Sequence, residues 1–248
     1  QMGLSLDEVA GELARLPALT PTGPVHIHAA EQVKEVADCV AWSGARPVEW
    51  LLDNAGVDER WCLIHSTHLD ANEVPRLAAS GAVAGLCPIT EGNLGDGIFS
   101  AVDYLAAGGR FGVGTDSNIL VDAAQELRAL EYSQRLAQRA RALLASDAAP
   151  FVGANLFANA VKGGAQALGV PAGLAAGHAA DIVSLDLDHP VFAGTDDATL
   201  LDRWIFAARS GAIDSVWRAS VKRVAHGRHV EGEAVGATYR ACVARLLA

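Results

Sequence analysis

The sequence predicts an α/β protein in which parallel strands alternate with helices. Four short apolar runs are separated by segments with helical periodicity. The runs are apolar throughout, which is typical of parallel strands that are buried on both faces. Three of the four runs end in a histidine or a carboxylate. Because the loops after parallel strands line one common face, this pattern also predicts a functional site.

The first 168 residues support this alternation element by element. A stripe of apolar side chains predicts a helix from Leu4 to Leu16, and the prolines that follow it predict a loop before the strand at Val25. Pro47 suits the first turn of a helix, and Asp70 suits a helix start. The expected strands are one that starts at 25 and ends just before 31, then 61–65, 82–87 and 111–116. The expected helices are 33–42, 47–55, 70–80, 98–107, 122–144 and 153–168, with a polar loop at 90–97.

The composition changes after Leu168, where residues 169–177 are rich in glycine, alanine and proline. Beyond this stretch the pattern predicts a strand at 179–186, a short helix at 200–208, strands or a hairpin at 215–219 and 222–225 with a turn at 226–228, and a closing helix at 233–247. We therefore predict two domains. Residues 1–170 carry the β/α series, and residues 171–248 form a small β-rich domain with a closing helix.

The composition argues against two classes of partner. Of the 248 residues, 51% are hydrophobic and 19% are charged, as in a globular protein with a large core. The 19 basic and 29 acidic residues give a net charge of −10, which argues against nucleic acid. No apolar run reaches the roughly 18 residues of a membrane span, and residues 1–8 do not resemble a signal peptide. We expect a cytoplasmic protein.

The four cysteines are interpreted as reduced core residues. Cys39, Cys62, Cys87 and Cys242 stand far apart, and no two form a C-x-x-C pair. Structural zinc sites normally show such close spacing, and disulfides are rare in the cytoplasm. We therefore expect neither disulfides nor a zinc site built on cysteine.

Candidate site residues lie at the ends of the first, second and fourth strands. His26 and His28 point to one face of a strand, and Glu31 follows where the strand gives way to a loop. His65 ends the second strand, and Asp116 ends the fourth run. Each has an ordinary structural alternative: a hydrogen-bonded core histidine, a histidine at a helix start, or an aspartate N-cap. Taken together they favour a metal-dependent catalytic site.

The chemistry of these side chains suggests four roles. A zinc ion lowers the pKa of bound water toward about 7, so that hydroxide exists at neutral pH. His28 could hold such an ion, and Asp116 could bind it and accept the water's proton. His65 could orient the hydroxide or stabilise charge. Glu31 could deliver the proton that a leaving nitrogen needs.

With these residues placed, the sequence resembles the metal-dependent amidohydrolase superfamily. Its barrels carry an H-x-H pair on strand one, histidines on strands five and six, and an aspartate on strand eight. Deaminases add a glutamate three residues after the strand-five histidine, as Glu31 follows His28. His65 and Asp116 match strands six and eight. The resemblance implies the C-terminal half (strands 5–8) of a (β/α)8 TIM-type barrel plus part of a small β-rich domain.

A narrower resemblance is to the formimidoylglutamate deiminase family. It rests on segments that a barrel does not require in general, among them Trp42-Ser43-Gly44 and the loop from Glu91 to Phe99. It implies a zinc-dependent aminohydrolase that converts N-formimino-L-glutamate to N-formyl-L-glutamate and ammonia in histidine degradation, with Fe²⁺ as the alternative metal. Deaminases of a ring substrate (guanine, cytosine or a thiomethyl nucleoside) are the alternative within the superfamily.

The sequence departs from the family at its start. His26 and His28 have the H-x-H spacing, but Glu31 follows them as it would on strand five. We therefore interpret His28 as the ligand and His26 as a supporting residue of the barrel interior. The chain is then half a barrel with open sheet edges. It needs a missing N-terminal half from the same or another chain, or it is a catalytically incomplete fragment.

Three further residues are expected to contact a small-molecule substrate: Gln32, Glu91 and Asn93. For the last two, ordinary turn chemistry in a Gly-rich loop is the alternative. Asn118 follows Asp116 and could orient it. We also expect a homodimer.

Overall fold

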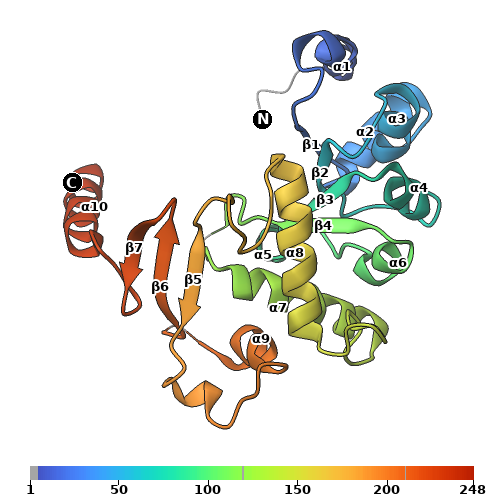
Figure 1. Cartoon of the computed structure of the whole chain (residues 1–248). Helices are drawn as coiled ribbons and strands as arrows, with labels where there is room; N and C mark the ends of the chain where they lie inside the picture. Colours follow the sequence, from blue (N-terminus) through green and yellow to red (C-terminus); the bar gives the residue numbers. More distant parts are fainter. Residues whose placement is uncertain (1–4, 119, 210) are drawn as a thin grey trace. The chain divides into compact units, whose positions relative to one another are not determined.

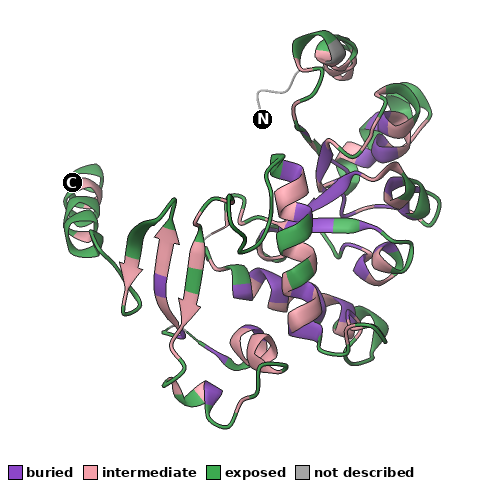
Figure 2. Ribbon diagram, viewed as in Figure 1, coloured by how far each residue is buried: buried purple, intermediate pink, exposed green. Residues whose placement is uncertain are grey.

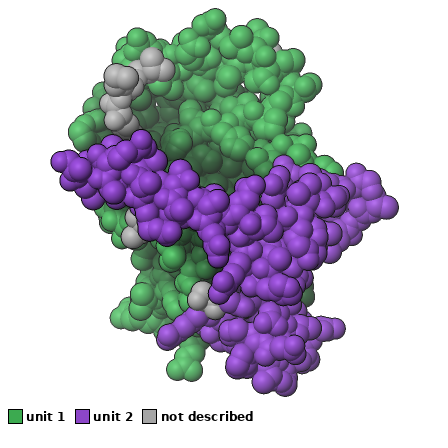
Figure 3. Space-filling model, turned by 90° about the vertical axis from the view of Figure 1, so that its left-hand side faces the viewer, with its two compact units in different colours: residues 1–172 green, residues 173–248 purple. Residues whose placement is uncertain are grey.

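The computed structural model describes residues 5–118, 120–209 and 211–248. The chain divides into two compact units, residues 1–172 and residues 173–248 (Figure 3). Each unit contains its own sheet of four strands.

The first unit contains a parallel sheet with strand order β1-β2-β3-β4 (Figure 1). Its strands are β1 (Val25–Ala29), β2 (Trp61–His65), β3 (Val83–Leu86) and β4 (Arg110–Val113). The register pairs His28 with Ile64 and Ala84 with Phe111. All of β3 and most of β2 are buried (Figure 2). The structure confirms the predicted series of parallel strands and helices.

Helices connect the strands and cover the sheet. They are α1 (Leu6–Leu19), α2 (Val33–Ser43), α3 (Pro47–Asn54), α4 (Glu73–Ser80), α5 (Pro88–Leu94), α6 (Ala101–Ala106), α7 (Ala123–Gln138) and α8 (Val152–Leu168). Cys62, Val83 and Ala167 form a buried cluster, so α8 packs directly on β2 and β3.

Several segments differ from the predicted boundaries, among them three helices of the first unit. Helix α1 continues to Leu19, and the predicted start at Leu4 lies outside the described residues. Residues within the predicted polar loop at 90–97 belong to α5, because Pro88 suits the first helical turn and Gly95 (φ 75) ends the helix. The long helix expected to reach residue 144 ends at Gln138, where Arg139 adopts a left-handed conformation.

Gly163 marks the closest approach of α8 to β4. A Cβ atom at this position would lie 2.0 Å from the carbonyl oxygen of Phe111, far inside van der Waals contact. The next residue, Gly164, has open space around its Cβ position. Close packing of α8 on β4 therefore requires a glycine at position 163 but not at position 164.

We expect Gly163→Ala to lower the stability of the folded chain by about 3 kcal/mol or more, because the helix must move off the strand. Gly164→Ala is the matched control. It replaces glycine in the same helix without a clash and should raise stability by up to about 1 kcal/mol. Urea unfolding of both variants measures the difference. Equal stabilities would contradict the close packing of α8 on β4.

The second unit contains an antiparallel sheet with order β5-β6-β7-β8. Its strands are β5 (Ile182–Leu185), β6 (Ile213–Arg218), β7 (Val221–Ala225) and β8 (Arg228–His229), and its helices are η1 (Pro190–Phe192), α9 (Leu200–Asp202), η2 (Arg203–Ala207) and α10 (Gly232–Leu246). Phe192, Ala208 and Ala212 form its buried cluster. Of the two arrangements left open for 215–225, the structure has a hairpin of β6 and β7.

The structure also bears on membrane spans and on the cysteines. Among the described residues, no helix is both long and apolar enough to cross a membrane. The four cysteines are all free, and Cys39, Cys62 and Cys87 are buried. Burial raises the pKa of the Cys62 thiol to about 11, so it is protonated at neutral pH.

Candidate active site

The turn after β1 places Glu31 at the end of the sheet. Ala30 adopts a left-handed conformation (φ 55), which is uncommon for a residue other than glycine. The carboxylate of Glu35 accepts hydrogen bonds from the backbone N–H groups of Ala30 (2.7 Å) and Glu31 (2.8 Å). Glu35 therefore fixes the backbone from which the Glu31 side chain projects.

The turn after β2 places His65, which is fully buried. His65 and Ser66 both have positive φ angles, 69° and 51°. The backbone N–H of Ser66 donates to the carbonyl of Ala29, and that of His68 donates to the carbonyl of Ala30, both at 3.0 Å. The turns after β1 and β2 are therefore tied together.

The turn after β4 places Asp116, which also has a positive φ (46°). The carbonyl oxygen of Thr115 accepts hydrogen bonds from Nδ2 of Asn118 (2.6 Å) and from the hydroxyl of Thr90 (3.2 Å). Nδ2 of Asn118 also donates to Oε1 of Glu126 (2.8 Å). Asn118 thus holds the loop that carries Asp116.

The three turns bring the predicted catalytic side chains together. Nε2 of His65 lies 3.5 Å from Oε1 of Glu31 and 3.8 Å from Oδ2 of Asp116. Nδ1 of the same ring lies 3.1 Å from Oε1 of Glu91. The ring centroids of His28 and His65 are 5.3 Å apart. The other four side chains therefore lie around the ring of His65, at the carboxyl ends of the strands.

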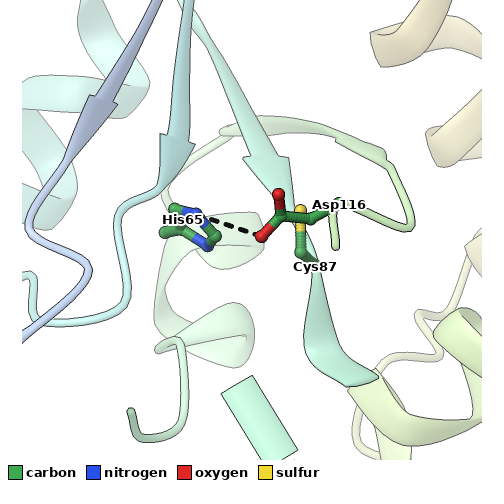
Figure 4. Close-up of side chains that lie close together, drawn as sticks. All are labelled: His65, Cys87 and Asp116. Carbon is green, nitrogen blue, oxygen red and sulfur yellow. Dashed lines mark ion pairs between the residues drawn. The ribbon is translucent and has the colours of Figure 1, made fainter. Parts of the chain in front are cut away.

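The arrangement fits a bound divalent cation. One ligand atom each of His65, Cys87 and Asp116 lie within 4.8 Å of one another (Figure 4). Nε2 of His65 is buried and has no hydrogen-bond partner among the described residues. Leaving a buried polar atom unpaired costs free energy, which a cation would offset. Nitrogen, sulfur and oxygen donors suit zinc or iron.

Cys87 was not expected in this position. The sequence places it among core residues, and its thiol is buried there, with burial raising its pKa to about 12. Cys87 lies near His65 and Asp116 only because three neighbouring strands end there. The spacing of these residues in the sequence does not predict this contact. His28, the ligand expected from sequence, lies outside this group of three.

The pKa of Glu31 and the pKa of His65 are both raised by their surroundings. Burial raises the pKa of the Glu31 carboxyl, and the charges of Asp96 and Asp116 raise it further. Burial lowers the pKa of His65, but the hydrogen bond with Glu91 and the surrounding carboxylates outweigh this effect, so the pKa is raised overall. Both shifts favour the protonated forms of these two side chains.

The contacts described above do not include three of the predicted residues, Gln32, Asn93 and His26. Gln32 precedes α2 at its N-cap position and makes no capping hydrogen bond with its side chain. Asn93 is exposed on α5. Nε2 of His26 lies 2.7 Å from the carbonyl oxygen of Ala167, at the end of α8. His26 thus contacts the helix that packs on the sheet.

A buried ion pair supports the loop after β2. Nε of Arg46 lies 2.7 Å from Oε2 of Glu73, whose side chain is only 2% exposed. The Arg46 guanidinium also donates to the carbonyl of His68, and the backbone N–H of Asp70 donates to Glu73. This network was not predicted, because its members come from α4 and from the loops that precede α3 and α4.

Glu126 of α7 is a buried carboxyl that supports two site segments. It accepts hydrogen bonds from the backbone N–H of Ile89 (3.0 Å) and from the side chain of Asn118. Burial raises its pKa from 4.5 to about 7. A raised pKa in the folded state means that folding favours the protonated form.

This shift predicts a pH dependence of stability. The contribution of Glu126 is fully present below about pH 4.5 and is lost as the pH rises through about 7. We expect the melting temperature to fall more steeply between about pH 5 and 8 in the wild type than in Glu126→Gln. Glu12→Gln, on the exposed face of α1, should keep the wild-type slope. Parallel slopes for the wild type and Glu126→Gln would refute the prediction.

Comparison with known proteins defines the class. Residues 23–234 match the Amidohydrolase family, and the chain belongs to that family. Formimidoylglutamate deiminase of Pseudomonas aeruginosa is 53% identical over 211 residues, which are 85% of this chain and 47% of that relative. The chain spans about half the length of the curated relatives it matches.

Solved structures agree with this class. An amidohydrolase from Brucella melitensis is 50% identical with a TM-score of 0.90, covering 96% of this chain and 53% of that one. An adenosine deaminase from Xanthomonas campestris, solved with bound zinc, is 26% identical with a TM-score of 0.83, covering 95% and 54%. High similarity with partial coverage confirms the predicted fold class, a partial barrel of the amidohydrolase type.

Proposed function

We propose that the chain is the C-terminal half of a zinc-dependent aminohydrolase that hydrolyses N-formimino-L-glutamate to N-formyl-L-glutamate and ammonia. The observation that carries the proposal is the convergence of Glu31, His65 and Asp116 at one end of the sheet. The 53% identical relative with this named activity supports the substrate. The reaction would serve histidine degradation in the cytoplasm.

The proposed metal ligands in this chain are His28 and Asp116. His65 and Cys87, which also lie near Asp116, are not proposed as ligands. Zinc is preferred because a 26% identical neighbour was solved with it, and Fe²⁺ is the alternative. When bound, the ion would lower the pKa of a water molecule and so make hydroxide available near neutral pH. Among the described residues, Nε2 of His65 has no hydrogen-bond partner, so a cation or a hydrogen-bond donor beside it would be favourable.

The side chains of this chain then account for the proton transfers. Hydrolysis forms a carbon–oxygen bond, breaks a carbon–nitrogen bond and requires a proton on the departing nitrogen. Glu31, whose pKa is raised by burial, can carry a proton to that nitrogen. Oδ2 of Asp116 can accept a proton from water. His65 lies between the two carboxyls and stabilises the charge that develops on oxygen.

The proposal includes an architecture for the complete protein. Residues 1–170 supply the second half of the barrel, and residues 171–248 supply the β-rich satellite domain. The first four strands and their H-x-H pair come from an N-terminal half in the same or another chain. Gln32 and Asn93 are proposed substrate contacts, and the assembly is proposed to be a homodimer.

The test uses a complemented protein, defined as this chain joined at its N-terminus to the N-terminal half of the Pseudomonas aeruginosa relative. Loaded with zinc, it should release ammonia from N-formimino-L-glutamate and not from guanine, cytosine or methylthioadenosine. Faster release from a ring substrate would replace the proposed substrate. No release from any of them, with the metal site filled, would overturn the proposed activity.

A further inference from the structure

Glu91 lies in the first turn of α5, and its carboxylate faces the catalytic histidine rather than solvent. The residue is 6% exposed and His65 is fully buried. Oε1 of Glu91 lies 3.1 Å from Nδ1 of His65, and the hydroxyl of Thr67 also donates to this oxygen (3.4 Å). The carboxylate therefore contacts the side of the ring opposite Glu31 and Asp116.

The backbone holds Glu91 in place. Its N–H donates to the carbonyl of Cys87, and its own carbonyl accepts hydrogen bonds from Gly95 (2.8 Å) and Asp96 (3.0 Å). The neighbouring Ile89 is fixed by Glu126 of α7. A carboxylate on such a rigid turn can set the orientation of a partner ring.

A carboxylate acceptor decides which ring nitrogen carries the proton. With Oε1 of Glu91 at hydrogen-bond distance, Nδ1 of His65 must be the donor. In the neutral ring Nε2 is then the free acceptor, and in the charged ring it is a second donor. In either state, Nε2 points to Glu31 and Asp116, where it has no hydrogen-bond partner among the described residues.

We propose that Glu91 is a positioning residue that fixes the orientation and the Nδ1–H tautomer of His65, so that Nε2 faces the reacting atoms. Its catalytic consequence rests on the proposed function, whereas the tautomer itself does not. Glu91 acts through His65 and reaches the chemistry without contacting the substrate. This role replaces the substrate contact expected for Glu91.

Two variants separate the hydrogen bond from the charge. Glu91→Leu removes the acceptor at similar size, and Glu91→Gln keeps an acceptor oxygen without the charge. In the zinc-loaded complemented protein, Glu91→Leu should lower kcat about 100-fold and leave KM within about threefold. Glu91→Gln should recover part of the loss, with kcat about tenfold below wild type.

The decisive readout is nitrogen NMR of ¹⁵N-histidine-labelled protein, which distinguishes the two ring nitrogens of His65. We expect the Nδ1–H form in the wild type and its loss in Glu91→Leu. Glu131→Gln is the matched control, because Glu131 is an equally buried glutamate on α7 that binds the backbone of Leu143 and Leu144. It should lower the melting temperature and leave the His65 spectrum unchanged.

The outcomes distinguish the two proposals. If folded Glu91→Leu keeps the Nδ1–H form of His65, or keeps kcat within about twofold of wild type, the positioning role is wrong. If the wild type does not hydrolyse N-formimino-L-glutamate, the proposed function is wrong. The spectrum of His65, and kcat on whichever panel substrate is hydrolysed, then still decide the role of Glu91.

Discussion

Glu31→Gln is expected to lower kcat for ammonia release about 1,000-fold in the complemented protein, because glutamine cannot deliver a proton to the leaving nitrogen. The shape of the site should be retained. Glutamine has the size of glutamate, and the backbone N–H of residue 31 remains bound to Glu35. The zinc content and KM should therefore change little. Steady-state kinetics and metal analysis of the purified variant measure both effects.

Glu12→Gln provides the control for this substitution. Glu12 lies on the exposed face of α1 and pairs with Arg15, so the same change of chemistry occurs far from the site. It should leave kcat unchanged. A Glu31→Gln protein that keeps more than about one tenth of wild-type kcat would contradict the role of Glu31 as the proton donor.

Asp116→Asn is expected to abolish both metal binding and activity. The substitution removes the negative charge from the proposed ligand and leaves only a weak neutral oxygen donor for the cation. It also removes the proposed acceptor for the proton of water. We expect zinc content to fall well below one ion per chain and kcat to fall to background.

Asp122→Asn tests whether such an effect is specific to residue 116. Asp122 is the N-cap of α7 and accepts hydrogen bonds from the backbone N–H groups of Ala124 and Gln125. Asparagine is about as good an N-cap as aspartate, so stability, zinc content and kcat should stay close to wild type. Full zinc occupancy in Asp116→Asn would exclude Asp116 as an essential ligand.

The local sequence pattern predicted the frame of the site. Continuous apolar runs predicted the strands, and the topology of parallel β/α units then required their carboxyl ends to share one face. This reasoning placed Glu31, His65 and Asp116 near one another without knowledge of any contact. The measured separations of 3.5 and 3.8 Å from His65 agree with that expectation.

The groups that hold the site could not be predicted in the same way. Glu35 and Glu126 occur within ordinary amphipathic helices, where a glutamate usually faces solvent. Their roles arise from hydrogen bonds to backbone groups of neighbouring turns. Contacts of this kind depend on where a helix packs. The periodicity of the sequence predicts only which face of the helix is apolar.

Helix α5 shows a second limit. A run of glycine, asparagine and aspartate predicts a polar loop, yet Pro88 at the first helical position starts a helix of seven residues. This short helix turns Glu91 toward His65. The left-handed conformations of Ala30, His65 and Asp116 could likewise not be predicted. Alanine rarely adopts a positive φ, and histidine and aspartate do so in only a small minority of cases.

Zinc analysis of the 248-residue chain by itself, beside the complemented protein, tests most directly whether the two halves of the barrel share the metal site. We expect about one tightly bound zinc ion per complemented protein, since His28 and Asp116 then act with an H-x-H pair. The chain alone should bind no stoichiometric zinc. Tight binding of one zinc ion by the chain alone would contradict a metal site that two halves of a barrel complete together.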